Sequence, residues 1–255
     1  MELMEFLYRV MEKLSDAGVP IVFKGAMVLN LVIQNNNPSK VERLTRDIDG
    51  DWIGEGPTME QMLNTLQTAV KDVDSSLLVE IYREFGEKKS AGFKIVNEFG
   101  EKIASIDLSV RKNEFTQPYL SYVNDVSIIG ASLDKMLADK LHAVSDKGVC
   151  RRVKDLVDIY AISYISECSI DKLVNIWDKT GRTPGDFTEF RERMTDIGLA
   201  YDKLVGIKNK PDFIDLYTRV SEFVYPFSDL EKNKGAVWTP YGWKGLPVQI
   251  KGRSR

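Results

Sequence analysis

The hydrophobic pattern of this 255-residue chain changes near residue 128, and this change constrains the fold more than any other feature. Before it, segments with apolar residues every three or four positions alternate with segments of strand-like pattern, so helices and strands are both expected. After it, only the helical spacing recurs. A mixed front followed by an all-helical back predicts an α+β chain, with one domain over residues 1–128 and a helical domain over residues 129–255.

The same pattern predicts the individual elements. In the front part we expect helices over residues 3–14, 26–33 and 58–73, and strands over residues 19–23, 47–53, 77–85, 92–99 and 103–110. A loop is expected over 34–38, and turns over 86–89 and 100–102. In the back part we expect helices over 133–141, 153–162, 171–178, 186–200 and 211–224, followed by an ordered tail rich in Gly, Pro and Trp.

Composition excludes several classes of protein. With 43% hydrophobic and 29% charged residues, the chain is neither disordered nor collagen-like. Its apolar runs are far shorter than the ~18 residues of a membrane span, and Glu2 and Glu5 near the start argue against a signal peptide. Cys150 and Cys168 are expected to be reduced thiols. These features predict a cytoplasmic protein that is not associated with a membrane.

The net charge of -3 hides an asymmetry. Residues 1–125 carry 14 basic and 20 acidic side chains, whereas residues 126–255 carry 21 basic and 18 acidic ones. Such an imbalance is a weak indication of a nucleic-acid or phosphate ligand. Chance variation between two solvated surfaces is the more ordinary explanation, so the charge alone decides nothing.

The most informative stretch contains the Asp-x-Asp pair Asp47 and Asp49. On an extended strand, residues two apart share a face about 6.5–7 Å apart, so both carboxylates can reach metal ions while Ile48 packs inward. Magnesium prefers oxygen ligands, and two such ions can clamp the attacking and leaving oxygens of a nucleotidyl transfer. Asp107 adds a carboxylate inside an otherwise apolar strand, where burial would require a cation. Asp51 extends the same face or is simply solvated.

A second feature, a helix that begins at Gly25 and Ala26, precedes this strand. The start of a helix offers unpaired amides and the positive end of the helix dipole to a phosphate. Beside two or three carboxylates that hold metal, such a helix predicts a site for a nucleoside triphosphate. The alternative is that the Asp-x-Asp pair is a turn or a polar strand face and binds nothing.

The order of these motifs resembles the polymerase-beta-type nucleotidyltransferase superfamily. More narrowly, Arg43-x-Thr45-x-Asp47-Ile48-Asp49 resembles the AbiEii/AbiGii-type nucleotidyltransferase toxins. Further segments that resemble this family are Lys135–Ala143, Lys154–Tyr160, and Phe223–Pro226 followed by Trp238 and Trp243. The likeness extends from about residue 18 to residue 245. It implies a nucleotidyltransferase-type mixed sheet with flanking helices, followed by a C-terminal helical module.

The resemblance also implies a metal site. Asp47 and Asp49 would hold Mg²⁺ (or Mn²⁺), and Asp107 would complete the site. Thr45 matches a hydroxyl position that some members of the family need for activity.

Nucleotide contacts are implied in the same way. Gly25 matches the glycine of the first motif, whereas Ala26 stands where other members have Gly or Ser, so backbone amides must replace a hydroxyl contact. Lys140 and Asp155 match a lysine and an aspartate that the helical module of the family directs toward the nucleotide. A fixed cation there would stabilise the charge that develops as pyrophosphate leaves.

The residues themselves leave alternatives open in the helical part. Lys140 is otherwise a solvated helix-surface lysine. Asp155 and Asp158 lie three positions apart and share a helix face. They either cap a neighbouring segment, pair with Arg151 or Arg152, or serve the site, and Asp155 would then orient Lys140 or the attacking hydroxyl.

The densest basic cluster contains Arg151, Arg152 and Lys154. It suits the phosphates of an RNA acceptor or of the triphosphate, and it is equally well explained as the solvated start of a helix. His142 is the only histidine, which disfavours a His-based triad or zinc site and indicates a packing or surface role. Three aromatic residues of the tail could stack on bases, although covering the core is the expected role: Trp238, Tyr241 and Trp243.

Together, the residues and the resemblance predict a metal-dependent nucleotidyltransferase that moves a nucleoside monophosphate from an NTP to an acceptor. The expected acceptor is the 3′ end of tRNA, and the expected role is the toxin of a toxin–antitoxin or phage-defence pair with a cognate protein antitoxin. One alternative is the same chemistry on a small molecule or a protein hydroxyl. Another is a non-catalytic nucleotide- or protein-binding module of this fold, against which the presence of Asp47, Asp49 and Asp107 argues.

Overall fold

The structure is a computed structural model that describes residues 1–36, 41–84 and 90–247. Contacts divide the chain into two compact units, Met1–Pro38 with Arg43–Leu133, and Ser39–Glu42 with Asp134–Arg255. The turn expected over residues 86–89 and the end of the tail, residues 248–255, lie outside the described residues.

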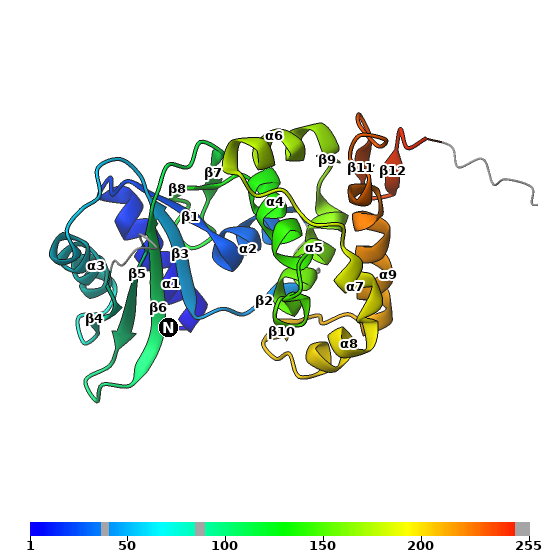
Figure 1. Ribbon diagram of the computed structural model, residues 1–255. Coiled ribbons are helices and arrows are strands. Elements are labelled where there is room, and N and C mark those ends of the chain that lie inside the picture. Colours follow the sequence, from blue (N-terminus) through cyan, green and yellow to red (C-terminus); the bar gives the residue numbers. More distant parts are fainter. Residues whose placement is uncertain (37–40, 85–89, 248–255) are drawn as a thin grey trace, which may run out of the picture. The chain divides into compact units, whose positions relative to one another are not determined.

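The first unit is built on a seven-stranded mixed sheet (Figure 1). Its strands are β1 (Ile21–Lys24), β3 (Asp47–Trp52), β4 (Leu78–Arg83), β5 (Ser90–Val96), β6 (Lys102–Val110), β7 (Thr116–Leu120) and β8 (Ser127–Ala131). They are ordered β4-β5-β6-β3-β1-β8-β7. β3 pairs parallel with β6, and β1 pairs parallel with β8, while the other neighbours are antiparallel. The strand with the Asp-x-Asp pair therefore lies in the interior of the sheet.

The two faces of this sheet differ in chemistry because side chains alternate along each strand. One face carries apolar residues such as Ile48, Phe93 and Ile106, which are fully buried. The polar residues that share the opposite face are Glu80, Lys94, Ser105, Asp107, Asp47, Asp49, Asp51 and Lys24. Burial of the apolar face holds the register, since a slip of one residue would turn the carboxylates into the core.

Two amphipathic helices, α1 (Leu3–Asp16) and α3 (Met59–Val73), lie on the same side of this sheet in Figure 1. The start of α3 is fixed by a capping box. The amide of Gln61 donates to Thr58 Oγ1 at 3.1 Å, and the amide of Thr58 donates to Gln61 Oε1 at 2.8 Å. Both helices confirm the amphipathic spacing of the sequence.

The remaining helix of this unit, α2 (Gly25–Asn36), follows β1 with no residue between them. It is longer than expected, since the sequence predicts a loop from Gln34 onward and the helix includes Gln34–Asn36. The last residues of the expected loop lie outside the described part of the chain.

The sequence pattern does not reveal β7 and β8. β7 contains Pro118 and β8 contains Gly130. Both residue types are uncommon inside strands, so the sequence pattern indicates a loop here. Their pairing explains why they form. β7 is an edge strand, where proline is tolerated, and β8 pairs with β1 from a distant part of the chain.

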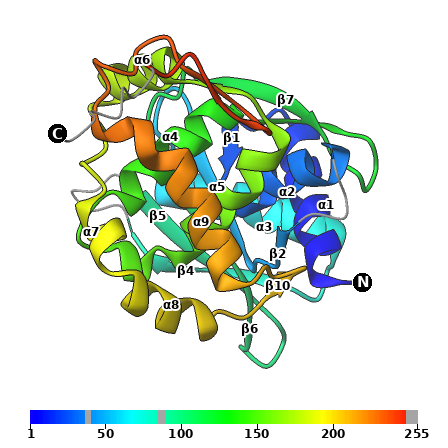
Figure 2. The same ribbon diagram turned by 90° about the vertical axis from the view of Figure 1, so that its right-hand side faces the viewer.

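The second unit is mainly helical, as predicted. Its α-helices are α4 (Leu133–Val144), α5 (Val153–Ile165), α6 (Ile170–Thr180), α7 (Thr188–Glu192), α8 (Met194–Asp202) and α9 (Phe213–Val224), with short 3₁₀ helices η1 (Val149–Arg151) and η2 (Tyr225–Ser228). Figure 2 shows α9 lying across α5. The indole Nε1 of Trp177 donates to the Ala138 carbonyl at 3.1 Å and ties α6 to α4 in the core.

Short strands complete this unit and were not expected. β9 (Cys168–Ser169), β11 (Val237–Thr239) and β12 (Gly242–Lys244) form a three-stranded sheet, and β10 (Ile207–Lys208) pairs with β2 (Glu42–Arg43). Over the described part of the chain, no helix combines the length and the apolarity that crossing a membrane requires.

Candidate active site

Asp47 and Asp49 lie on the polar face of β3, at the end where the strand begins. Asp47 is exposed and Asp49 is half-buried, whereas Ile48 between them is fully buried. Asp49 is the direct partner of Asp107 in the parallel pairing of β3 with β6. The structure therefore places the three carboxylates singled out from the sequence on one face of two adjacent strands.

Gly25 lies directly against Asp49. Lys24, the last residue of β1, is the antiparallel partner of Asp49, so α2 begins beside that carboxylate. Gly25 has a φ of +74°, and a Cβ at this position would be 2.6 Å from Asp49 Oδ2. The backbone angle and the close approach both require glycine. Ala26 follows and is buried, so its methyl group serves the core.

Two hydroxyl groups contact Asp47. Its backbone amide donates to Thr45 Oγ1 at 3.2 Å, and Ser105 Oγ donates to its Oδ1 at 2.5 Å. Ser105 is the β6 partner of Asp47 and is buried. Sequence reasoning missed Ser105, although its position two residues before Asp107 places it on the same strand face and could have identified it.

Asp107 is held by two side chains of β4. The Tyr82 hydroxyl donates to Asp107 Oδ1 at 2.7 Å, and Arg83 Nη2 donates to the same oxygen at 2.5 Å. A β-bulge after Ile81 lets consecutive residues reach one carboxylate, and Gly92 leaves room for the ring, since a Cβ there would lie 2.5 Å from it. Burial and the hydrogen bond to Asp107 raise the pKa of Tyr82 to about 12, so it is a hydroxyl donor at neutral pH.

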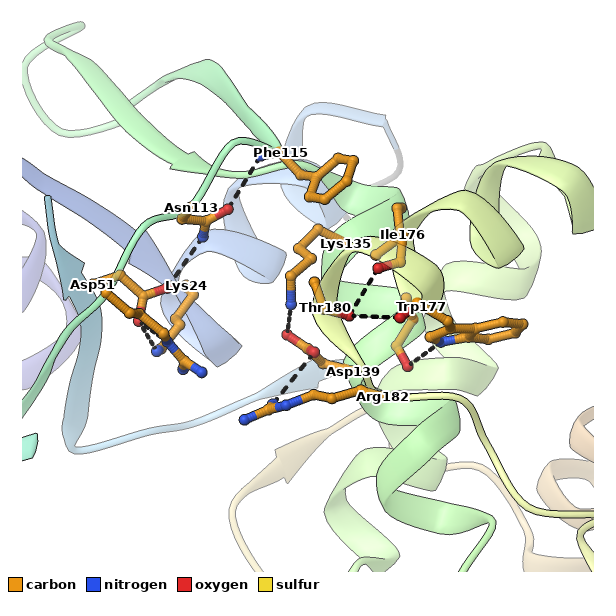
Figure 3. A network of polar contacts seen from close by, with 12 residues as sticks. Lys24, Asp51, Asn113, Phe115, Lys135, Asp139, Ile176, Trp177, Thr180 and Arg182 are labelled. Carbon is orange, nitrogen blue, oxygen red and sulfur yellow. Dashed lines mark hydrogen bonds and ion pairs between the residues drawn. The ribbon is translucent and has the colours of Figure 1, made fainter. Parts of the chain in front are cut away.

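Asp51 is buried, which excludes the solvated alternative. Lys24 Nζ and Arg111 Nε both donate to its Oδ1, the latter at 2.7 Å, and Asn113 Nδ2 donates to Oδ2 at 3.1 Å (Figure 3). Burial by itself would raise the pKa of Asp51, but the charge of Lys24 and the bonds from both cations hold it below its ordinary value. Burial in turn lowers the pKa of Lys24. Asp51 thus ties β1 and β3 to the segment that follows β6.

The described residues contain no group of three or more His, Cys, Asp or Glu side chains arranged to hold a metal ion. Asp107 is turned to Tyr82 and Arg83, which leaves Asp47 and Asp49 as the carboxylate pair at the exposed end of β3. Magnesium in nucleotide sites commonly binds one or two carboxylates and fills its shell with water and substrate phosphates. The pair therefore fits such an ion, and Asp107 as a metal ligand stays a prediction.

In the second unit, Lys140 of α4 is buried between two carboxylates of α5. Its Nζ donates to Asp158 Oδ2 at 2.5 Å and to Asp155 Oδ1 at 3.2 Å. The side chain of Asp158 is 3% exposed and that of Asp155 is 19% exposed. Arg152 lies 3.9 Å from Asp155. Lys140 is therefore not a solvated helix-surface lysine, and one of the alternatives left open by the sequence, an ion pair between Asp155 and Arg152, is present.

Asp139 precedes Lys140 but belongs to a separate cluster. It pairs with Lys135 and, at 3.5 Å, with Arg182 (Figure 3). His142 Nδ1 lies 3.0 Å from the Thr183 carbonyl, which agrees with a packing role for the single histidine. The exposed basic residues on η1 and the start of α5 are Arg151, Arg152 and Lys154.

The aromatic tail divides into two buried or half-buried indoles and one exposed phenol. Trp238 is 1% exposed and its Nε1 donates to the Ser163 carbonyl at 2.9 Å. Trp243 Nε1 donates to the Glu222 carbonyl at 3.1 Å. These indoles stabilise the helical unit, as expected for a tail that covers the core. Tyr241 is 97% exposed and has no part in that packing.

Several residues that surround the carboxylates are not predicted from the sequence. Lys24 could have been suspected because it directly precedes Gly25. Arg83, Tyr82 and Arg111 give no local signal, since they reach the carboxylates only through strand pairing and a bulge.

Comparison with solved structures supports the fold. The chain is similar to JHP933 from Helicobacter pylori, with 15% identity, a TM-score of 0.55, and coverage of 89% of this chain and 91% of that one. It is also similar to a putative nucleotidyltransferase from H. pylori, with 13% identity, a TM-score of 0.56, and coverage of 90% and 95%. It is similar as well to MenT4, a nucleotidyltransferase toxin from Mycobacterium tuberculosis H37Rv, with 12% identity, a TM-score of 0.55, and coverage of 89% of this chain and 83% of that one. At these identities the likeness concerns the fold alone.

Comparison of sequences identifies the family. No curated protein matches the chain. The family described as "Nucleotidyl transferase AbiEii toxin, Type IV TA system" matches residues 5–215, which include both the carboxylate strands and the Lys140 cluster. Because the match spans most of the chain, the protein belongs to the AbiEii nucleotidyltransferase toxin family.

Proposed function

We propose that this toxin-family nucleotidyltransferase moves a nucleoside monophosphate from a nucleoside triphosphate to the 3′ end of tRNA, in a reaction that depends on Mg²⁺ (or Mn²⁺). Family membership supports nucleotidyl transfer and implies a cognate antitoxin. The metal, the tRNA acceptor, direct binding of the antitoxin, action in the cytoplasm and a role in phage defence are parts of the proposal.

The observation that carries the proposal is the contact between the start of α2 and the Asp-x-Asp strand. Gly25 approaches Asp49 so closely that no side chain fits between them, and Asp47 lies on the same face. A helix start with its backbone amides thus lies beside a carboxylate pair. Phosphate and a hard cation are the ligands that suit these two features together.

In this proposal, different residues of the chain hold the metal ion and bind the phosphate. Asp47 and Asp49 would hold the metal ion, which when bound neutralises triphosphate oxygens and aligns the attacking and leaving oxygens. The backbone at Gly25 and Ala26 would bind phosphate without the hydroxyl that other members have. Thr45 orients the backbone of Asp47 through their hydrogen bond.

The helical unit supplies the proposed acceptor contacts. Arg151, Arg152 and Lys154 are exposed, and guanidinium and ammonium groups at such positions bind the phosphates of RNA. Lys140 and Asp155 are proposed to serve the nucleotide because they match the family's lysine and aspartate.

An incorporation assay tests the chemistry. The protein is incubated with each labelled NTP, Mg²⁺ and total RNA, and wild type is compared with Asp49→Asn and with Asp72→Asn, a matched change at an exposed residue of α3. Label is expected in tRNA with wild type and Asp72→Asn, and is expected to be lost with Asp49→Asn or with chelator. Incorporation that survives Asp49→Asn rules out the metal role, and label in a protein or small molecule instead of RNA rules out the tRNA acceptor.

A growth assay tests the toxin role separately. Expression of the wild type should slow growth of the host, whereas expression of Asp47→Ala to the same level should not. Equal toxicity of the two forms would separate the toxic effect from this site.

A further inference from the structure

We propose that Arg83 is a built-in counterion of Asp107 that competes with the metal ion for this carboxylate, so that a divalent cation held by Asp47 and Asp49 would have to displace Arg83 to gain Asp107 as a further ligand. This inference rests on the proposed metal dependence. It adds to the site a residue that no motif marks, and it gives a role to the bond by which Arg83 holds Asp107.

The first step is the charge at this point of the sheet. Asp49 and Asp107 are direct partners on adjacent parallel strands, which lie about 4.8 Å apart. Like charges directly opposite one another on a sheet repel. Cations therefore stabilise the pair: the charge of Lys24 acts on Asp49, and Arg83 neutralises Asp107 through a 2.5 Å bond from Nη2 to Oδ1.

The second step is that this ion pair can open. The side chain of Arg83 is 48% exposed and that of Asp107 is 29% exposed. Half-exposed pairs of this kind are weak, because water replaces them readily. A divalent cation carries twice the charge of the guanidinium and can take its place, and the Tyr82 hydroxyl remains as a hydrogen-bond donor to Asp107.

Asp51 shows the contrast on the same face. It is 3% exposed and accepts hydrogen bonds from Lys24, Arg111 and Asn113. Such a buried and fully bonded carboxylate cannot exchange its partners without large loss of stability. Of these two ion-paired carboxylates, Asp107 is therefore the one built to exchange a protein cation for a metal ion.

The test measures metal binding directly. Mn²⁺ is titrated into nucleotide-free protein and the free ion is followed by electron paramagnetic resonance. Arg83→Gln should lower the Mn²⁺ dissociation constant of the site by about two- to fivefold, the strength of a half-exposed ion pair. Arg83→Lys keeps the charge and should bind Mn²⁺ as the wild type does.

A matched control separates competition from general electrostatics. Lys94 lies on the same face of the sheet and pairs with Glu80 at 2.7 Å, so Lys94→Gln removes one positive charge without touching Asp107. It should leave Mn²⁺ binding unchanged. Thermal unfolding of each variant checks that the sheet is intact.

The outcomes distinguish this inference from the proposed function. The inference alone is tested when wild type binds Mn²⁺ and Asp49→Asn does not. In that case, unchanged or weaker Mn²⁺ binding by Arg83→Gln overturns the inference and leaves the metal site in place. Tightening of Mn²⁺ binding by Lys94→Gln equal to that by Arg83→Gln does the same. Mn²⁺ binding that survives Asp49→Asn, or no binding by either wild type or Arg83→Gln, overturns the metal site and the inference together.

Discussion

Gly25 and Asp49 leave no space between them: the helix that begins at Gly25 approaches the carboxylate so closely that a methyl group at residue 25 would lie 2.6 Å from Oδ2. The approach follows from the register of β1 and β3, in which Lys24 is paired with Asp49. The position of the carboxylate and the start of the helix are thus mechanically coupled.

Gly25→Ala should therefore impair both stability and activity. A residue with a Cβ at φ of +74° loses about 1–2 kcal/mol, and displacement of Asp49 by ~1 Å is expected to slow transfer about 100-fold. Urea denaturation and initial transfer rates measure the two effects. Gly18→Ala is the matched control, because the φ of Gly18 is +66° and a Cβ there would meet no atom within 4 Å beyond the adjoining residues. It should lose stability and keep activity, and equal activity of both variants would contradict the coupling.

Asp51→Asn should destabilise the first unit by about 3 kcal/mol, because it removes the carboxylate that pairs with both Lys24 and Arg111 and leaves partly buried charges. Arg111→Gln should lower the free energy of unfolding by ~1 kcal/mol or less, since Asp51 keeps its pair with Lys24. Urea denaturation of both variants measures the difference. A larger loss for Arg111→Gln than for Asp51→Asn would show that Asp51 is not the centre of the network.

The contribution of Asp51 should also depend on pH. Its pKa in the folded state lies below the ordinary value of 3.8, so the folded protein binds that proton more weakly than the unfolded chain does. Its stabilising effect is therefore complete above that ordinary value and is lost as the pH falls through the folded-state pKa. The difference in unfolding free energy between wild type and Asp51→Asn should be constant from about pH 5 to 8 and shrink below about pH 4. A difference that grows on acidification would refute this account.

The Lys140 cluster predicts a split between its two carboxylates. Asp158→Asn should destabilise the second unit by about 3 kcal/mol, because Asp158 is buried beside the Lys140 ammonium. Asp155→Asn should lower the unfolding free energy by ~1 kcal/mol, because Asp155 is more exposed, yet it should slow transfer at least about tenfold if it serves the nucleotide. Chemical denaturation and transfer rates distinguish the two. A folded Asp155→Asn variant with wild-type rate would assign Asp155 a structural role only.

The exposed basic residues predict a salt-dependent contact with RNA. The double variant Arg151→Gln with Lys154→Gln should weaken tRNA binding and lower the slope of log affinity against log salt by about 1–2, as expected for two lost phosphate contacts. Its unfolding free energy should stay within ~0.5 kcal/mol of wild type. Lys232→Gln with Lys234→Gln removes the same charge from exposed positions of the same unit. Equal weakening by both pairs would indicate a diffuse charge effect instead of a binding surface.

Local patterns of the sequence determined much of the fold. The helical and strand periods located most of the longer elements, because burial of one face imposes those periods on any amphipathic segment. The spacing of Asp47 and Asp49 placed them on one strand face, which the structure confirms. Thr58 and Gln61 form a capping box within one helical turn, and α3 begins there, as the sequence predicts.

Only the tertiary structure decided which distant groups meet. Asp49 faces Asp107, and Ser105 reaches Asp47 across 58 positions, through the pairing of β3 with β6. Arg83 reaches Asp107 through a bulge in another strand. Strand order, register and burial arise from packing the whole sheet, and none of them is encoded in the few residues on either side of a carboxylate. For that reason the sequence alone identified the acidic residues, while the cations that neutralise them became visible only in the folded chain.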